Sequence, residues 1–371
     1  MNSASLGCRV TIFLVLSSCL PAVGQNQFPS DQQVPSYPNY STVENDPQVP
    51  SSEAPTVVDI QEREEFPPGK IHRKGGFGFG GGSKMPGYAA TWYPSVDVKD
   101  QRTDFSVVRQ SLNAGVPVWR NAQDVVVLTT RVKNALFFTD AILPDTGRPF
   151  PDALWDVRFG LSYIHHFENG WTVGLMPSLG SASDQPFDSA DELNYGILTF
   201  LRIPARNNRD SWRFSLFYSS AGNLNFPIPG IAYNWNPHED FSMNIGIPFS
   251  LFWRPRDNVT IDLSYLPLTN VKARITVHMA NNVHLYGGYE FLNEAYFLAD
   301  RENTQDRFMG FEQRLISGIR WSLFANATLD LNAGYAFDRH FGEGANQGAD
   351  LIDRVDISSG GFLSGSLRLA F

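Results

Sequence analysis

Apolar and polar residues alternate along most of the chain from residue 88 onward. In the segment 258–265, NVTIDLSY, apolar residues occupy the odd positions and polar residues the even positions. Residues 241–253, 271–279 and 327–337 repeat this period of two. Successive side chains of a β-strand point to opposite faces, so the pattern predicts strands with one apolar and one polar face. Further strands are expected to begin near Thr103, Asp124, Trp155, Trp171, Leu193, Trp212, Val283 and Arg307.

The length of these segments favours a membrane barrel over a soluble β-protein. A soluble sandwich or a lipocalin-like barrel also alternates, with its apolar face turned inward. A strand that crosses a membrane needs about 9–11 residues, whereas strands of globular proteins cluster near about 5–6. The alternating segments of this chain belong to the longer class. We therefore expect an all-β fold, a transmembrane antiparallel up-and-down β-barrel.

The C-terminal segment, ISSGGFLSGSLRLAF, alternates up to the last residue. Its apolar face carries Leu363, Leu367, Leu369 and Phe371, and its polar face carries Ser364, Ser366 and Arg368. The last residues of a soluble protein are commonly frayed and polar. A final strand that ends in an aromatic residue resembles the signal read by the barrel-assembly machinery of bacterial outer membranes. We therefore expect that machinery and outer-membrane lipids as partners, and the bacterial outer membrane as the location.

Five tryptophans are expected at one level of the barrel. They lie near the ends of predicted strands, on the same side of the membrane as the C-terminus. Indole rings prefer the membrane interface, because the ring is apolar and its N–H needs a polar partner. We predict an aromatic girdle composed of Trp119, Trp171, Trp212, Trp253, Trp321 and Phe371.

The connections between predicted strands alternate in length. Long connections are expected near 134–153, 181–191, 293–306 and 339–356, with tight turns between them. Outer-membrane barrels show this asymmetry, with short periplasmic turns and long external loops. All long connections stay on one side if residues 220–240 form a single external loop. The count is then about 14 strands within 86–371, or about 12 if the first two segments do not span the membrane.

Residues 1–24 have the features of a secretory signal peptide. Arg9 precedes an apolar stretch, and Ala22-Val23-Gly24 fits a cleavage site. Cys19 also fits a lipoprotein box, in which it would be lipidated and become the new N-terminus. Both ways of processing remain open. Since Cys8 and Cys19 are the only cysteines of the chain, the mature protein is predicted to have no disulfide.

Residues 25–85 predict a disordered linker. The segment is rich in Pro, Ser, Gln and Asn and has no apolar period. It is acidic as far as Glu65 and ends in a glycine-rich run at 75–82. That run contains G-x-G-x-x-G, but it lacks the preceding strand and following helix of a dinucleotide site, so a hinge is expected. The acidic linker and the net charge of −9 exclude a nucleic-acid surface.

The polar strand faces are expected to line the barrel interior if the apolar faces meet lipid. The predicted lumen lining comprises Arg158, Arg202, Arg213, Asp262, Lys272, Arg274, Glu290, Glu312, Arg314, Asp330 and Arg368. Both signs of charge occur, with a moderate basic excess. Such charges either filter solutes in an open pore or pair across a narrow lumen and plug it. The sequence leaves both alternatives open.

No metal, cofactor or catalytic site is expected. His278 and His284 are predicted to face one another across the turn at 280–282, but no third ligand has a defined spacing. No local hydrolase motif such as G-x-S-x-G occurs. A triad can assemble from distant residues, so an outer-membrane lipid hydrolase remains the least favoured alternative.

Residues 88–371 resemble an uncharacterised family of exported outer-membrane β-barrels, a domain of unknown function. The resemblance rests on the alternating strands, the barrel-closing end and segments such as FSMNIGIPFSLFWRP and LNAGVPVW. It implies the fold and the location, and it brings no activity or catalytic residue. From the residues themselves we predict a pore or gated passage for small solutes. A structural or adhesive barrel without transport is the alternative.

Overall fold

A computed structural model describes residues 86–369 apart from 208, 221–225, 267–269, 281, 325 and 346–349, together with the two short segments 58–59 and 77–78. Those two segments, β1 (Val58–Asp59) and β2 (Phe77–Gly78), form a parallel pair. The predicted signal peptide, both cysteines, most of the predicted linker and Phe371 lie outside the described residues.

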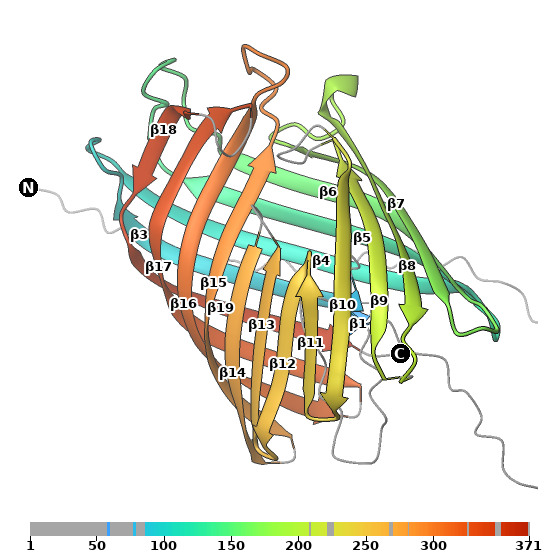
Figure 1. Ribbon diagram of the computed structural model, residues 1–371. Helices are drawn as coiled ribbons and strands as arrows, with labels where there is room; N and C mark the ends of the chain where they lie inside the picture. The colour runs from blue at the N-terminus through green and yellow to red at the C-terminus, as the bar shows by residue number, and fades with distance from the viewer. Residues whose placement is uncertain are drawn as a thin grey trace, which may run out of the picture. The chain divides into compact units, whose positions relative to one another are not determined.

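The strands β3 to β17 and a sixteenth strand, β19, form a closed antiparallel barrel (Figure 1). Each strand pairs with its neighbours in the chain, and Leu363 of β19 pairs with Trp92 of β3 to close the ring. The spanning strands are β3 (Gly87–Asp97), β4 (Asp104–Arg120), β5 (Asp124–Phe138), β6 (Ala153–His166), β7 (Thr172–Ser183), β8 (Leu193–Pro204), β9 (Ser211–Ser219), β10 (Ile228–His238), β11 (Phe241–Gly246), β12 (Phe249–Arg256), β13 (Val259–Leu266), β14 (Asn270–Ala280), β15 (Val283–Tyr296), β16 (Arg307–Phe324), β17 (Ala327–Gly344) and β19 (Gly360–Leu369).

The two ends of the barrel differ in their connections. One end, here called the long-loop end, carries residues 139–152, 184–192 and 297–306 and the connections from β9 to β10 and from β17 to β18. The opposite, short-turn end carries only brief connections such as 239–240 and 257–258. The additional strand β18 (Ile352–Ile357) pairs with the part of β17 nearest the long-loop end, while β19 pairs with the rest of β17. The predicted long connections therefore all lie at one end.

The strand number corrects the expectation of about 14. Residues within 220–240, expected to form one loop, contain the complete strand β10. Residues 241–253, expected to form one strand, instead belong to a hairpin of β11 and β12. The chain reverses at Gly246, whose φ of +146° favours glycine, and Pro248 has no N–H to donate to a ladder. Alternation continues through this hairpin, so the period alone did not reveal the reversal.

The height of the barrel wall is uneven around the ring. β16 and β17 each have 18 residues, whereas β11 has six and β12 and β13 have eight each. In Figure 1 the upper ends of β11 to β13 accordingly lie well below the upper ends of β10 and β15. β14 pairs with β15 only as far as Leu292, so the last residues of β15 pair with β16 alone.

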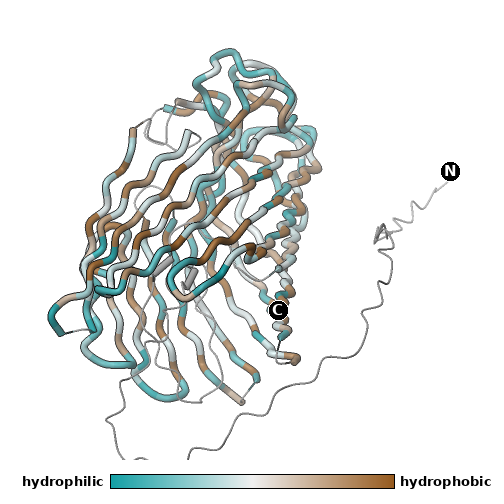
Figure 2. The backbone as a smooth tube through the Cα atoms, turned by 90° about the vertical axis from the view of Figure 1, so that its right-hand side faces the viewer, coloured by the Kyte–Doolittle hydropathy of each residue, from teal (hydrophilic) through white to brown (hydrophobic). Residues whose placement is uncertain are grey.

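Large apolar side chains cover the outside of the barrel. Leu128, Phe159, Leu315 and Tyr335, from four different strands, are each at least half exposed. Figure 2 shows hydrophobic and hydrophilic positions alternating along the strands, with hydrophilic residues concentrated in the connections. An apolar surface of this extent is incompatible with water and matches the lipid-facing band of membrane barrels. The polar faces therefore point into the barrel.

An apolar cluster fills part of the interior at the long-loop end. The rings of Phe105, Phe137, Phe150 and Phe341 lie with centroids 5.1–5.8 Å apart. Phe150 belongs to the connection 139–152, whose Leu143 is also buried. This connection thus packs against the inner wall instead of extending into solvent. Within the described part of the chain, no helix is long and apolar enough to cross a membrane.

Candidate functional site

The charged side chains predicted to line the lumen all lie on strand faces opposite the exposed apolar residues. They are Arg158 (β6), Arg202 (β8), Arg213 (β9), Asp262 (β13), Lys272 and Arg274 (β14), Glu290 (β15), Glu312 and Arg314 (β16), Asp330 (β17) and Arg368 (β19). The structure brings several of them into direct contact, but it distributes the two signs of charge unequally around the ring.

On the inner faces of β15 to β17 and β3 to β5, glutamate carboxylates form ion pairs with arginine and lysine side chains. Glu312 accepts hydrogen bonds from the Tyr93 hydroxyl at 2.6 Å and from Arg339 Nε at 3.0 Å, and it pairs with Arg314. Glu294 pairs with Arg109 and lies 3.5 Å from Lys133 Nζ. Glu294 lies on β15, which is five strands from the β4 strand of Arg109, so the contacts of Glu294 cross the interior. Buried charges persist where they are paired and hydrogen-bonded in this way.

Two smaller groups extend this network along β14 to β17. Glu290 lies 3.8 Å from Lys272 Nζ and 3.7 Å from Arg274, on the neighbouring strand. Arg320 Nε donates to Asp330 at 3.2 Å, and the Tyr286 hydroxyl donates to the same carboxylate. The Arg274 guanidinium lies 4.3 Å from the centre of the Tyr286 ring. Sequence reasoning found most of the charged residues of this network but missed Glu294, Arg109, Lys133 and Arg339.

A segment after β15 crosses the barrel at the long-loop end. Phe297 forms a parallel bridge with Ser183 at the end of β7, and its N–H donates to the Ala182 carbonyl at 2.8 Å. β7 and β15 are eight strands apart in either direction around the ring. Two residues later, the Ala299 N–H donates to the Asp184 carboxylate at 2.9 Å. This crossing segment, residues 297–299, joins opposite walls of the barrel.

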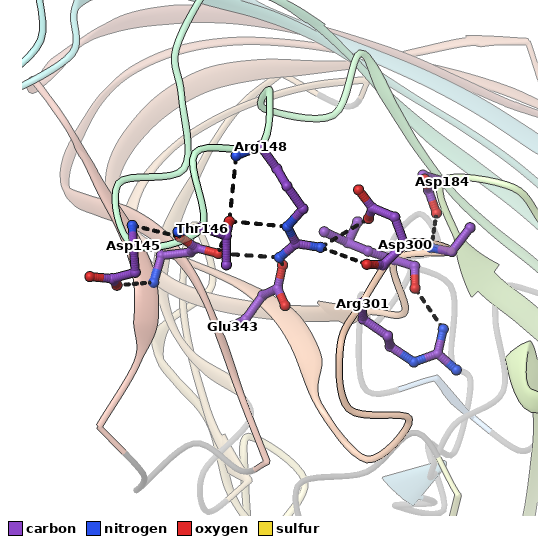
Figure 3. A network of polar contacts seen from close by, with 10 residues as sticks. Asp145, Thr146, Arg148, Asp184, Asp300, Arg301 and Glu343 are labelled. Carbon is purple, nitrogen blue, oxygen red and sulfur yellow. Dashed lines mark hydrogen bonds and ion pairs between the residues drawn. The ribbon is translucent and has the colours of Figure 1, made fainter.

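Arg148 connects three external segments at the same end (Figure 3). Its guanidinium lies 3.0 Å from Asp300, in the connection 297–306, and 3.2 Å from Asp353 of β18, and it also pairs with Glu343 of β17. Three carboxylates from separate parts of the chain therefore hold the connection 139–152 in place. We call Arg148 and these three carboxylates the loop latch.

Asp353 is the most completely bonded member of the loop latch. Its carboxylate accepts hydrogen bonds from the Asp145 and Thr146 N–H groups at 2.8 and 2.9 Å and from the Thr146 hydroxyl at 2.7 Å. Burial by itself would raise the pKa of this carboxyl, but the hydrogen bonds from Thr146 and Arg148 outweigh burial and hold the pKa below its ordinary value. Asp353 therefore stays ionised at neutral pH. Sequence reasoning gave these connections no role, because they carry no period.

A different arrangement occurs on the inner faces of β8 and β9, near the short-turn end. Arg202 and Arg213 are directly opposite one another in the strand register. Arg213 is only 3% exposed. Arg202 Nε donates to Ser211 Oγ at 3.1 Å, and Asn234 Nδ2 of β10 donates to the same oxygen at 3.2 Å. Like charges directly opposite one another destabilise a sheet unless something compensates them.

His278 and His284 approach one another as the sequence predicted. Their Nδ1 atoms lie 3.1 Å apart and their rings meet edge to face. Thr260 Oγ1 lies 3.2 Å from His278 Nε2. Within the described residues, no group of three or more His, Cys, Asp or Glu side chains could hold a metal ion.

The predicted girdle tryptophans lie at the short-turn end. Trp119, Trp171, Trp212, Trp253 and Trp321 are all exposed there, whereas Phe371 lies outside the described residues. Trp235 of β10 is exposed at the same end, and its ring meets that of Phe241 edge to face at 5.3 Å. It was missed because residues 220–240 were assigned to a loop.

The closed ring, its apolar exterior and its charged interior define a transmembrane β-barrel of the bacterial outer-membrane type. The family model described as "Domain of unknown function (DUF6268)" matches residues 145–342, more than half of the chain. The protein belongs to this family. No curated protein is significantly similar in sequence.

Three solved structures are among those that match this chain, and the description of one names an outer membrane channel. The β-domain of the Bordetella autotransporter BrkA is 12% identical, with 78% of this chain and 100% of that chain covered and a TM-score of 0.29. An outer membrane channel from Pseudomonas putida F1 is 6% identical, with 79% and 100% covered and a TM-score of 0.35. OccK7 of Pseudomonas aeruginosa is 9% identical, with 77% and 98% covered and a TM-score of 0.35. Sequence identities and TM-scores this low do not allow a function to be transferred to this chain.

Proposed function

We propose that the protein is a gated outer-membrane passage for small solutes, closed at its long-loop end by the crossing segment and the loop latch. The observation that carries the proposal is that polar contacts between separate segments close the long-loop end. The crossing segment joins opposite walls through one bridge and two hydrogen bonds, which its N–H groups donate to the Ala182 carbonyl and the Asp184 carboxylate. The loop latch consists of ion pairs around Arg148. Glu343 and Asp353 are buried, so the loss of the cation that they share would leave buried carboxylates without a counter-charge and weaken the closed end.

The charged interior supports the same proposal. A barrel that only anchors loops has no need to place arginines opposite one another inside its wall, as Arg202 and Arg213 are placed. Charged side chains that line a pore select solutes in known channels. A structural or adhesive barrel is the second candidate, favoured by the cross-lumen pairing of Glu294 with Arg109 and Lys133, which fills part of the interior.

Planar-bilayer recording of the refolded barrel tests the gate. We expect small, intermittent conductance from the wild type and a several-fold larger open probability from Arg148→Gln, because that change removes the cation shared by three carboxylates. Arg354→Gln is the control, since Arg354 is exposed and pairs only locally with Asp356. Absence of conductance in both the wild type and Arg148→Gln would overturn the passage and favour the structural role.

The proposal includes export and insertion. We propose that residues 1–24 direct export, with processing after Gly24 or lipidation at Cys19, and that barrel-assembly machinery and outer-membrane lipids are the partners. Mass spectrometry of the mature N-terminus distinguishes the two processing routes. We further propose that the barrel is not an enzyme. Phospholipid turnover by the refolded barrel would contradict this.

A further inference from the structure

We infer that Glu192, Ser183 and Asp184 form a proton-sensitive switch that holds the crossing segment more firmly in mildly acidic solution. The three residues lie where the crossing segment meets the end of β7. As a statement about conduction, the inference rests on the proposed passage. As a statement about how firmly the crossing segment is held, it rests on these three side chains and their hydrogen bonds alone.

The first step is the burial of Glu192, the last residue of the short 3₁₀ helix η1 (Ala190–Glu192). Glu192 is only 1% exposed, although its side chain carries a carboxyl group. Its oxygen Oε2 is buried and has no hydrogen-bond partner within the part of the chain that the structure describes. Burial of an ionised carboxylate is costly unless it is paired and hydrogen-bonded. Glu192 is therefore costly to keep ionised in this position.

The second step is the charge around this carboxyl group. Asp184 repels a negative charge on Glu192, and Arg301 attracts one. The Arg301 guanidinium, however, directs its N–H groups to backbone carbonyls: Nη1 donates to Leu298 at 2.6 Å and Nη2 donates to Asp191 at 3.2 Å. Burial, together with the charge of Asp184, outweighs the favourable contacts and raises the pKa of Glu192 above its ordinary value.

The third step is the number of protons available at Ser183, which is fully buried. Its hydroxyl donates to Asp184 at 3.1 Å and also lies within hydrogen-bonding reach of the Glu192 carboxyl group. A serine has one proton to donate, so it cannot serve two ionised carboxylates at once. The Gln185 N–H occupies one of its two acceptor sites. A protonated Glu192 can donate to the other site, and Ser183 then donates to Asp184 without competition.

The fourth step is the connection from Asp184 to the crossing segment. The Asp184 oxygen that accepts from Ser183 also accepts the Ala299 N–H at 2.9 Å. The backbone of Ser183 forms the bridge with Phe297. A proton on Glu192 therefore completes one chain of hydrogen bonds, which runs from Glu192 through Ser183 and Asp184 to the crossing segment. It also removes the repulsion between two neighbouring carboxylates.

The direction of the pH response follows from the raised pKa of Glu192. In the closed arrangement this carboxyl group binds a proton more tightly than an exposed glutamate does, whose ordinary pKa is 4.5. The closed arrangement therefore gains stability as pH falls through the raised pKa, and the gain is complete below the ordinary value. The loop latch weakens only below about pH 4. The long-loop end should thus be closed most firmly between these two ranges.

Two measurements test the switch on the full-length refolded barrel. Hydrogen–deuterium exchange of the Phe297 and Ala299 amides reports how firmly the crossing segment is held, after correction for the pH dependence of intrinsic exchange. Planar-bilayer recording reports the open probability. From about pH 8 to about pH 5, the wild type is expected to gain several-fold protection of both amides and to lose several-fold in open probability.

Two variants test the chain of hydrogen bonds. Glu192→Gln keeps a donor group at this position and cannot ionise. At about pH 8 it should protect the two amides as strongly as the wild type does at about pH 5, with little further response to acid. Ser183→Ala breaks the chain between Glu192 and Asp184 and should lose most of the response. The backbone bridge to Phe297 does not depend on the serine side chain.

The matched control is Asp191→Asn. Asp188 and Asp191, the remaining acids of the connection 184–192, are exposed. Asp191→Asn therefore removes the same charge as Glu192→Gln, from the neighbouring residue, without changing a buried group. It should respond to pH as the wild type does. Heat-modifiable gel migration establishes that each variant has folded.

The outcomes separate the switch from the proposed passage. Protection of the two amides that does not change with pH in the folded wild type overturns the switch, whether or not the barrel conducts. Equal effects of Glu192→Gln and Asp191→Asn also overturn it, because the response would then follow the total charge of the connection. A wild type that does not conduct overturns the passage, and amide protection then decides the switch on its own.

Discussion

Phe297 and Ser183 pair with one another although their strands stand on opposite sides of the barrel. This bridge divides the ring of strands into two halves. On one side lie the apolar cluster around Phe150 and the carboxylate network of Glu312. On the other lie β8 to β14, with the opposed arginines and the lowest part of the wall. The following predictions concern the parts that hold this arrangement together.

Phe150→Ala should destabilise the long-loop end. Phe150 is 4% exposed and packs against three inner-wall phenylalanines and Phe308. Truncation of a buried phenylalanine costs about 3–5 kcal/mol. The temperature of the gel-migration change should fall. Ile142→Ala in the same connection is the control, because that side chain is exposed. An equal fall in both variants would show that Phe150 has no special role.

Glu312→Gln should destabilise the interior network. The substitution leaves Arg314 and Arg339 buried without the carboxylate that both contact. Loss of one partner of a buried ion pair costs about 3–5 kcal/mol. Denaturant unfolding of the refolded barrel measures the effect, with exposed Glu302→Gln as the control. Unchanged stability would mean that water already solvates these arginines.

The closed state of the loops should weaken in acid. The pKa of Asp353 in the folded protein lies below its ordinary value of 3.8. A depressed folded pKa contributes stability above the unfolded pKa, and that stability is lost as pH falls through the folded pKa. Open probability should therefore rise as pH falls below about 4.

Two variants isolate the contribution of Asp353 to this pH dependence. Asp353→Asn should be more open at neutral pH and respond less to acid. Asp356→Asn is the control, because the pKa of Asp356 is also lowered, by hydrogen bonds from Arg354, and titrates in the same range. The other acidic side chains around Asp353 or Arg148 are Asp145, Asp300 and Glu343. An acid response unchanged by Asp353→Asn would contradict the prediction.

Gly246→Ala should disturb the hairpin of β11 and β12. A Cβ atom at Gly246 would lie 2.1 Å from the Ile231 carbonyl oxygen, and φ is +146° there. Backbone strain of this kind costs about 1–3 kcal/mol. The temperature of the gel-migration change reports the loss. Gly287→Ala is the control, since its nearest neighbour would be 3.7 Å away.

Local alternation predicted most of the strands, the end that carries the long connections and the strand faces on which the charged residues lie. It works because each strand residue is either lipid-facing or inward-facing. It failed at Gly246, where the period continues through a reversal, and at 220–240, where β10 was taken for loop. Local alternation could not predict the loop latch. Arg148, Asp300 and Asp353 meet through tertiary contacts that no period records.

The unequal strand lengths make the rim of the barrel higher on one side than on the other. β16 and β17, with 18 residues each, and the β18 strand beside them extend towards the long-loop side, while the wall of β11 to β13 ends early. A large particle that approaches this side of the membrane, such as an antibody, meets the β16–β18 rim first. A small molecule travelling along the bilayer surface meets the lowest part of the rim at β11 to β13. Large particles and small molecules therefore first meet different parts of the rim.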